Sequence, residues 1–292
     1  MERAAYPSDL TDAQWEIIEP LLPPLGESTF CETVPRREIV NGIRYVMRSG
    51  CQWRMMPHDL PHWNTVYTCH RQWCKDGVWK RINDALVALE RERKGRKAKP
   101  SAAVGDSQSV KTTQKRGDRG YDGAKKVKGR KRHIATDTDG NLLTCVVTPA
   151  NIGERAGMKL VINILKKDVP ELKKMFVDGG YDGEPFSLWA KTTHQLEIEV
   201  KRRPDEGVTV RDGIAQVPTN NPSEEQIRMA FEITRNGKKA FVVVSKRWVV
   251  ERTFAWLYNF RRLKVDYEEK IDVSEGFIYA ASSCILLRRL CA

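Results

Sequence analysis

The sequence predicts an α/β protein in which an all-helical region precedes a mixed sheet with flanking helices. Apolar residues recur at helical spacing from the start to about residue 92, and beyond residue 101 their period shortens toward two. The segment between, RERKGRKAKPSAA, is cationic, poor in apolar residues and interrupted by glycine and proline. After it, strand-like runs alternate with helical patterns, as expected for a sheet covered by helices.

The first region divides into amphipathic segments joined by short turns. They span residues 11–22, 36–48, 62–74 and 75–90. Pro20 is expected to kink or end the first segment, and Gly50 is well placed to end the second. Short helices joined in this way predict a helix-turn-helix-like DNA-binding domain over residues 1–92.

Five strands are predicted beyond a basic linker at 93–101. They span residues 102–110, 133–137, 142–148, 174–178 and 196–201, with helices expected over 152–167 and 184–191. The second and third strands form a hairpin around DTDGN. Three meander-like strands followed by alternating helices and strands are the order of ribonuclease H-like folds. One catalytic domain is therefore predicted over 102–292, with an insertion near 209–236 because that segment is rich in glycine, proline and asparagine.

The charge of the chain indicates a polyanionic partner. Its 292 residues include 50 Lys and Arg against 38 Asp and Glu, a formal charge of +12 with a pI near 9.4. The cations cluster in RERKGRKAK, KKVKGRKR and RRLK, which suits phosphate backbones. An odd number of cysteines without a CxxC pair does not favour a disulfide framework. With no export signal or long apolar run, a cytoplasmic, nucleoid-associated protein is expected.

Three acidic residues indicate the chemistry of the predicted site. Asp106 and Asp178 lie in strand-like runs, and Glu251 opens a basic, aromatic helix. An ionised acid inside a strand is unfavourable unless it is paired or metal-bound, and Mg²⁺ prefers carboxylate oxygens. Two such ions can stabilise both the attacking and the leaving oxygen of a phosphodiester. The acids therefore predict a site for Mg²⁺ or Mn²⁺, with two ions, although each alone could be a surface strand, turn or helix residue.

Polar side chains of the helical region and basic side chains nearer the acids are candidate DNA contacts. The segment 62–74 offers base-reading side chains on its polar face, although an amphipathic helix facing only water is the plainer alternative. The predicted contacts are Asn64, Thr68, Arg71, Gln72, Lys75, Lys125, Lys126, Lys128, Arg130, Lys131, Arg132, Arg247, Tyr258, Arg261 and Arg262. A zinc site among the cysteines and histidines of 51–74 is disfavoured, because their spacing matches no common structural site.

Several longer motifs carry a family resemblance. YPSDLTDAQWEIIEPLLPP, GIRYVMRSGCQWRMMPHDLPHWNTVY, VGDSQSVKTT, FVDGGYDG and RWVVERTFAWLYNFRRLKVDYE occur in this order. With them the chain resembles the DDE transposases of the IS5 family of insertion sequences. The resemblance implies that Asp106, Asp178 and Glu251 are a metal-binding triad in a ribonuclease H-like domain. It also implies binding to terminal inverted repeats and to target DNA.

The chain departs from the family signature of Tyr, Arg, Glu and Lys around the third acid. Val244 stands at the tyrosine position and Tyr258 at the lysine position, whereas Arg247 is present. Because two element ends must be paired, a dimer on double-stranded DNA is expected. Two alternatives remain open: a nuclease of the same fold that cuts without joining, and a DNA-binding repressor whose catalytic domain is inactive.

Overall fold

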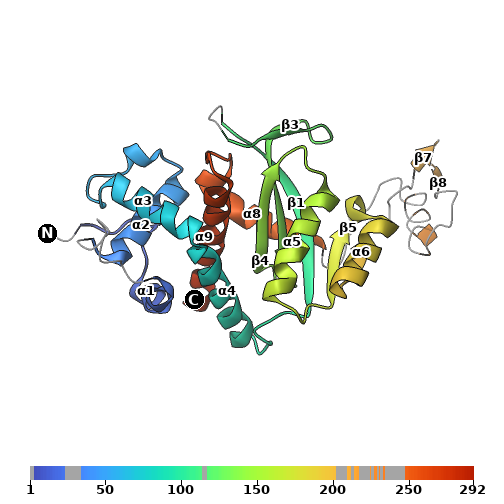
Figure 1. Cartoon of the computed structure of the whole chain (residues 1–292), viewed down its shortest axis with the longest axis horizontal. Coiled ribbons are helices and arrows are strands. Elements are labelled where there is room, and N and C mark those ends of the chain that lie inside the picture. The colour runs from blue at the N-terminus through green and yellow to red at the C-terminus, as the bar shows by residue number, and fades with distance from the viewer. Residues whose placement is uncertain are drawn as a thin grey trace.

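The computed structural model describes residues 3–23, 34–113, 117–201 and 247–292, with short pieces between 209 and 233. Figure 1 shows helices at one end of the molecule, a sheet at the other, and the long helix α9 (Ile271–Leu290) between them. The predicted α/β class and its order along the chain are therefore confirmed.

The helical region has the segments that the sequence predicts. Its helices are α1 (Asp12–Ile18), α2 (Arg36–Ser49), α3 (Trp63–Lys75) and α4 (Val78–Arg93). Thr11 caps α1 by accepting a hydrogen bond from Gln14 N. Pro20 lies in the 3-10 turn Glu19–Leu21 that follows α1. Gly50 ends α2 in a left-handed conformation with φ +73°, which favours glycine.

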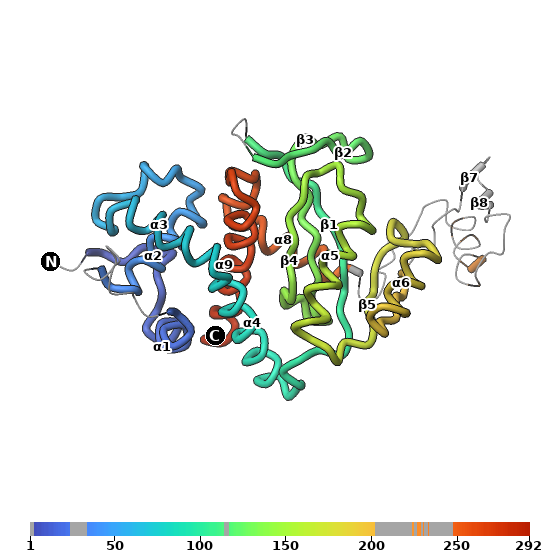
Figure 2. The backbone as a smooth tube through the Cα atoms, viewed as in Figure 1, coloured from blue at the N-terminus to red at the C-terminus, as the bar shows by residue number. Residues whose placement is uncertain are grey.

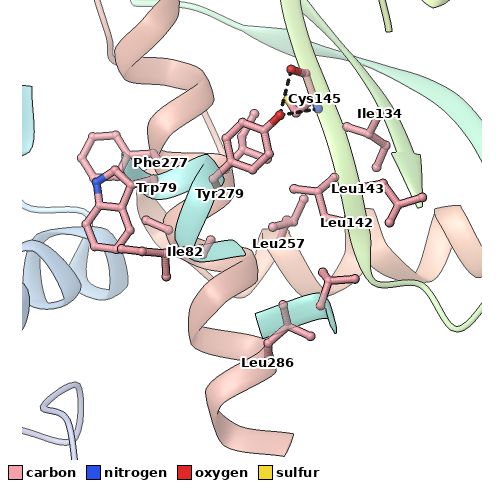
Figure 3. Packing of buried hydrophobic residues seen from close by; sticks show 14 of the residues in the cluster. Trp79, Ile82, Ile134, Leu142, Leu143, Cys145, Leu257, Phe277, Tyr279 and Leu286 are labelled. Carbon is pink, nitrogen blue, oxygen red and sulfur yellow. Dashed lines mark hydrogen bonds between the residues drawn. The ribbon is translucent and has the colours of Figure 1, made fainter. Parts of the chain in front are cut away.

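Helix α9 joins the N-terminal helices and the sheet into one core. It packs against α3, α4 and the strand β4 (Leu142–Pro149), and Figure 2 shows it running beside α4. In Figure 3, Phe277 and Tyr279 of α9 lie among apolar side chains of α4 and β4, and Cys145 N donates to the Tyr279 hydroxyl at 2.9 Å. The buried cluster is continuous, so the linker at 93–101 separates segments of the chain and not two cores.

The sheet has six strands where five were predicted. Besides β4 they are β1 (Ala102–Lys111), β2 (Gly120–Asp122), β3 (Val127–Thr136), β5 (Lys174–Asp178) and β6 (Glu197–Lys201). The main order is β4-β3-β1-β5-β6, and the short, unpredicted β2 pairs with the start of β3. Neighbours are antiparallel from β4 to β1 and parallel from β1 to β6.

Helices cover both faces of the sheet. Figure 1 shows α5 (Glu154–Asp168) in front of it and α8 (Arg247–Tyr258) behind it. The helix α6 (Glu184–His194) lies beside β6. A separate hairpin of β7 (Thr209–Arg211) and β8 (Ile214–Gln216) falls within the predicted insertion. The rest of that insertion lies largely outside the described residues.

Gly157 allows α5 to lie close to the sheet. A Cβ at this position would be 2.1 Å from the buried ring of His133 on β3. Gly157→Ala should lower the free energy of unfolding by about 1–2 kcal/mol, because overpacking exceeds the gain in helix propensity. Urea unfolding measures this. Gly153→Ala, where a Cβ meets nothing within 4 Å, is the control, and equal stability of the two variants would contradict the close packing.

His70 makes the stability of the folded state depend on pH. It is fully buried, and its Nδ1 accepts a hydrogen bond from Trp79 Nε1 at 3.1 Å. Burial lowers the pKa of His70 to about 3. Because the unfolded chain binds this proton near pH 6.5, stability is lost as the pH falls below that value.

A His70→Asn variant isolates this contribution. It should be less stable than wild type at pH 7, since the buried hydrogen bond with Trp79 is altered. Below pH 6.5, the difference in free energy of unfolding between wild type and variant should shrink by up to about 1.4 kcal/mol per pH unit. The reason is that only wild type carries the buried imidazole, whose protonation favours the unfolded chain. Urea unfolding at pH 7 and pH 5 tests this, and a constant gap would contradict it.

Candidate active site

Asp106 and Asp178 lie on neighbouring parallel strands. In the pairing of β1 with β5, Val104 stands opposite Phe176, and each aspartate is two residues further along its own strand. Alternate residues of a strand share a face, so both carboxylates project from the same face of the sheet. The sequence prediction that these two strands place their acids together is consistent with this register.

That face is the one covered by α8. On β3, Ile134 stands opposite Asp106, and Arg132, two residues away, donates to the carbonyl oxygen of Leu263 at 2.8 Å. Leu263 lies in the 3-10 turn Arg261–Leu263, which follows α8. Helix α8 itself contacts β1, β3 and β5. It carries Glu251, which is exposed.

Backbone N–H groups orient both aspartates. Ser107 N donates to Asp106 Oδ1 at 2.7 Å, and Gly180 N donates to Asp178 Oδ1 at 3.0 Å. Through the second bond Asp178 caps the 3-10 turn Gly179–Tyr181. A fixed orientation is what a ligand or catalytic acid requires.

The surroundings of Asp106 favour the binding of a cation. Burial, together with the nearby carboxylates of Asp178 and Glu154, raises the pKa of Asp106 to about 7, although the Ser107 N–H and Lys125 act in the opposite direction. A divalent cation would relieve this repulsion, and the oxygen donors suit Mg²⁺ or Mn²⁺. Among the described residues, however, no three acid, histidine or cysteine side chains converge closely enough to hold a metal ion. The structure thus brings Asp106 and Asp178 together, and the role of Glu251 as a third ligand stays a prediction.

Glu154 is the acid beside this pair that sequence reasoning missed. It lies in the first turn of α5, with its Oε1 3.3 Å from Ser107 Oγ and 3.2 Å from Lys125 Nζ. A Cβ on Gly180 would be 2.6 Å from its Oε2. The helical pattern at 152–167 places Glu154 near a helix start, but nothing in the sequence indicates that this end returns to Asp106.

Four of the predicted DNA contacts are wrong, because their side chains are buried. These are Arg130, Lys131, Arg132 and Arg262. Lys131 pairs with Asp122 at 3.1 Å, and Arg262 pairs with Glu268 at 2.7 Å. The physical reason for the first three is that β3 lies between β1 and β4 with both faces covered, so cations that read as a surface run are enclosed.

The other candidates are more open. The exposed ones are Asn64, Thr68, Arg71, Gln72, Lys75, Lys125, Lys126, Lys128 and Arg261, whereas Tyr258 is half-buried. The Arg247 side chain lies outside the described part of the chain. Four α3 residues, Thr68, Arg71, Gln72 and Lys75, line a groove of about 310 Å³ with Lys270 and Asp272 at the start of α9. This position leaves the polar face of α3 open to a large partner.

Comparison with known protein families identifies the class to which this strand pair, with its two acids, belongs. The family described as transposase DDE domain matches residues 97–286, and a putative transposase of IS4/5 family matches residues 10–83. The chain therefore belongs to the DDE transposases of insertion sequences, and the resemblance found in the sequence is confirmed.

Two relatives come from Burkholderia cepacia. The putative transposase for insertion sequence element IS402 is 25% identical over 157 residues, 51% of this chain and 59% of the relative. An uncharacterised 16.2 kDa protein of the same element is 34% identical over 86 residues, 27% of this chain and 58% of the relative. The chain thus spans less than two thirds of each relative's length. No solved structure matches, and no helix in the described ranges is long and apolar enough to cross a membrane.

Proposed function

We propose that this chain binds the terminal inverted repeats of an insertion sequence, cuts the DNA there, and joins the freed end to target DNA. The observation that carries the proposal is the pairing of Asp106 and Asp178, on one face of neighbouring parallel strands. We further infer a ribonuclease H-like catalytic domain. The strand order β4-β3-β1-β5-β6, with its antiparallel and parallel halves, supports this inference.

Asp106, Asp178 and Glu251 are the proposed ligands for Mg²⁺ or Mn²⁺. When bound, two such ions would lower the pKa of an attacking water and stabilise the leaving oxygen. The chain's own contribution is to hold the carboxylates. Ser107 in β1 and Gly180 in the 3-10 turn after β5 fix their orientation through backbone N–H groups. In the joining step the freed 3′-hydroxyl would take the place of water and attack the target phosphodiester. The bond between that phosphorus and the 3′-oxygen of the target strand would break, and this oxygen would leave as a 3′-hydroxyl.

For DNA binding we propose two kinds of contact. Asn64, Arg71 and Gln72 on the open face of α3 would read base edges in the major groove. The exposed residues Lys125, Lys126, Lys128 and Arg261 would contact phosphates, which adds affinity without sequence preference. Two element ends must meet for joining, so we also propose a dimer on double-stranded DNA, acting at the nucleoid.

The function can be tested with wild-type protein and duplex DNA carrying the element's own ends. We expect nicking at the 3′ end of the element that requires Mg²⁺ or Mn²⁺ and that stops on chelation. DNA of unrelated sequence should be bound more weakly and left uncut. Binding to the ends without any metal-dependent nicking would favour the inactive repressor instead.

A further inference from the structure

Lys125 places a positive charge beside the two aspartates. It lies in the turn between β2 and β3, and its side chain is exposed. Its Nζ is 3.2 Å from Glu154 Oε1 and 3.5 Å from the carbonyl oxygen of Ser107. Because Ser107 follows Asp106 directly, these contacts hold the ammonium group next to the proposed catalytic acid.

Glu154 is itself held on several sides. The helix that carries it is seated on the sheet, with Gly157 against His133 and Met158 against Gly105. Its Oε1 accepts a hydrogen bond from Ser107 Oγ at 3.3 Å, and Oε2 lies against the backbone of Gly180. The carboxylate therefore has a fixed place between the residues that follow Asp106 and Asp178.

We propose that Glu154 is a positioning residue, which holds Lys125 so that its ammonium group contacts the non-bridging oxygens of the reacting phosphate. The inference rests on the proposed function. A phosphodiester approaching two aspartates meets negative charge, and within the described ranges Lys125 is a cation held beside Asp106. In the protein without DNA, Glu154 is the counter-ion of Lys125.

A double-mutant cycle in single-turnover nicking tests this coupling. Lys125→Met should slow nicking by about a hundredfold, because a cation is lost where charge develops. Glu154→Gln should slow it by about tenfold or more. If Glu154 acts through Lys125, the double variant should be no slower than Lys125→Met alone. If the rate losses of the two single variants multiply in the double variant, the proposal is overturned. The charge-matched controls are Glu16→Gln on α1 and Lys167→Met in the last turn of α5, both on exposed side chains.

Metal affinity separates positioning from ligation. We expect Glu154→Gln to leave the Mn²⁺ dependence of the melting temperature, measured without DNA, as in wild type. A loss of about tenfold or more in Mn²⁺ affinity would make Glu154 a ligand and overturn the proposal. Gly180→Ala should slow nicking as Glu154→Gln does, since its Cβ would displace the Glu154 carboxylate. If wild type does not nick DNA, the proposed function fails. If it does but Lys125→Met nicks normally, only the inference about Glu154 fails.

A cationic cleft, which is separate from the acid pair, lies at the end of the sheet where β1 and β5 begin. Its volume is about 1040 Å³, and its lining includes Arg91, Arg96, Lys97, Lys99, Glu171 and Lys173. The segment predicted as a linker forms one wall and is anchored there. Arg91 Nε donates to the carbonyl oxygen of Lys97 at 2.8 Å, and Arg96 pairs with Asp139 at 2.7 Å.

We propose that this cleft binds the phosphate backbone of a duplex DNA segment other than the one that reaches Asp106 and Asp178. Lys97, Lys99 and Lys173 are exposed on its two walls, and Glu171 is the acid among the lining residues. Because the walls are preformed, binding costs little ordering of the chain. Backbone contact by lysines is largely independent of sequence.

Fluorescence anisotropy with a duplex of unrelated sequence, at several salt concentrations, tests the cleft. Lys99→Gln/Lys173→Gln should bind more weakly, with a slope of log K against log salt that is smaller by about 2. Lys167→Gln/Lys191→Gln, on exposed side chains of α5 and α6, is the control and should match wild type. An unchanged slope in the cleft variant would overturn this proposal. A wild type that binds no DNA would overturn the proposed function instead.

Discussion

Asp178→Ala is expected to abolish metal-dependent nicking, with a loss on the order of 10³-fold in the single-turnover rate. The magnitude follows from metal catalysis contributing several kcal/mol, where each 1.4 kcal/mol is about tenfold. Asp178 ends β5 and bonds Gly180 N, so the substitution removes a carboxylate without removing a core side chain. Binding to the element's ends should persist, because the open face of α3 lies on a different part of the chain.

The same assay with Asp118→Asn gives a matched control. Asp118 is an exposed acid of the loop before β2, and its variant should nick at the wild-type rate. Nicking by Asp178→Ala at that rate would contradict the assignment of the acid pair. Glu251→Gln belongs in the same series, and a loss similar to that of Asp178→Ala is expected if Glu251 is the third ligand.

Arg130→Met is expected to lower the free energy of unfolding by about 3–5 kcal/mol, since it leaves a buried carboxylate without its cation. Arg130 is 1% exposed and pairs with buried Asp266 at 3.2 Å. It also donates to the carbonyl oxygens of Asp118, Glu268 and Glu269 at 2.7–2.8 Å. Methionine fills a similar volume but satisfies none of these acceptors.

Urea unfolding measures the effect of Arg130→Met, with the exposed Arg119→Met as its control. Arg119→Met should change the free energy of unfolding by no more than about 0.5 kcal/mol, because the Arg119 side chain is exposed. If Arg130→Met is as stable as this control and instead weakens DNA binding, then Arg130 is a phosphate contact after all, as its sequence neighbourhood first indicated.

Local patterns in the sequence are enough to predict much of the fold. The short apolar run at 174–178 predicts β5 with its observed bounds, and Gly50 predicts the end of α2. The acid pattern also predicts that Asp106 and Asp178 share one site, because paired divalent ions need carboxylate ligands close together.

The burial of the basic run could not be predicted in the same way. VKGRKRHI reads as a solvated cationic surface, yet it is β3 between two other strands. The partners that make this possible, such as Asp266 for Arg130 and the Leu263 carbonyl for Arg132, are more than a hundred residues away in the chain. Glu154 was missed for a related reason: only the packing of α5 on the sheet brings it to Ser107.

Joining of DNA is the most direct measurement of the central claim. Duplexes with a free 3′-hydroxyl at the element's end, mixed with target DNA and Mg²⁺, should give joined products with wild type and none with Asp178→Ala. Because these substrates are already cut, the assay isolates strand transfer from nicking. Joined product from Asp178→Ala would contradict the role of the acid pair. If wild type joins none of these substrates but nicks uncut element ends in the separate assay, the proposed strand transfer is contradicted and a nuclease of this fold is left.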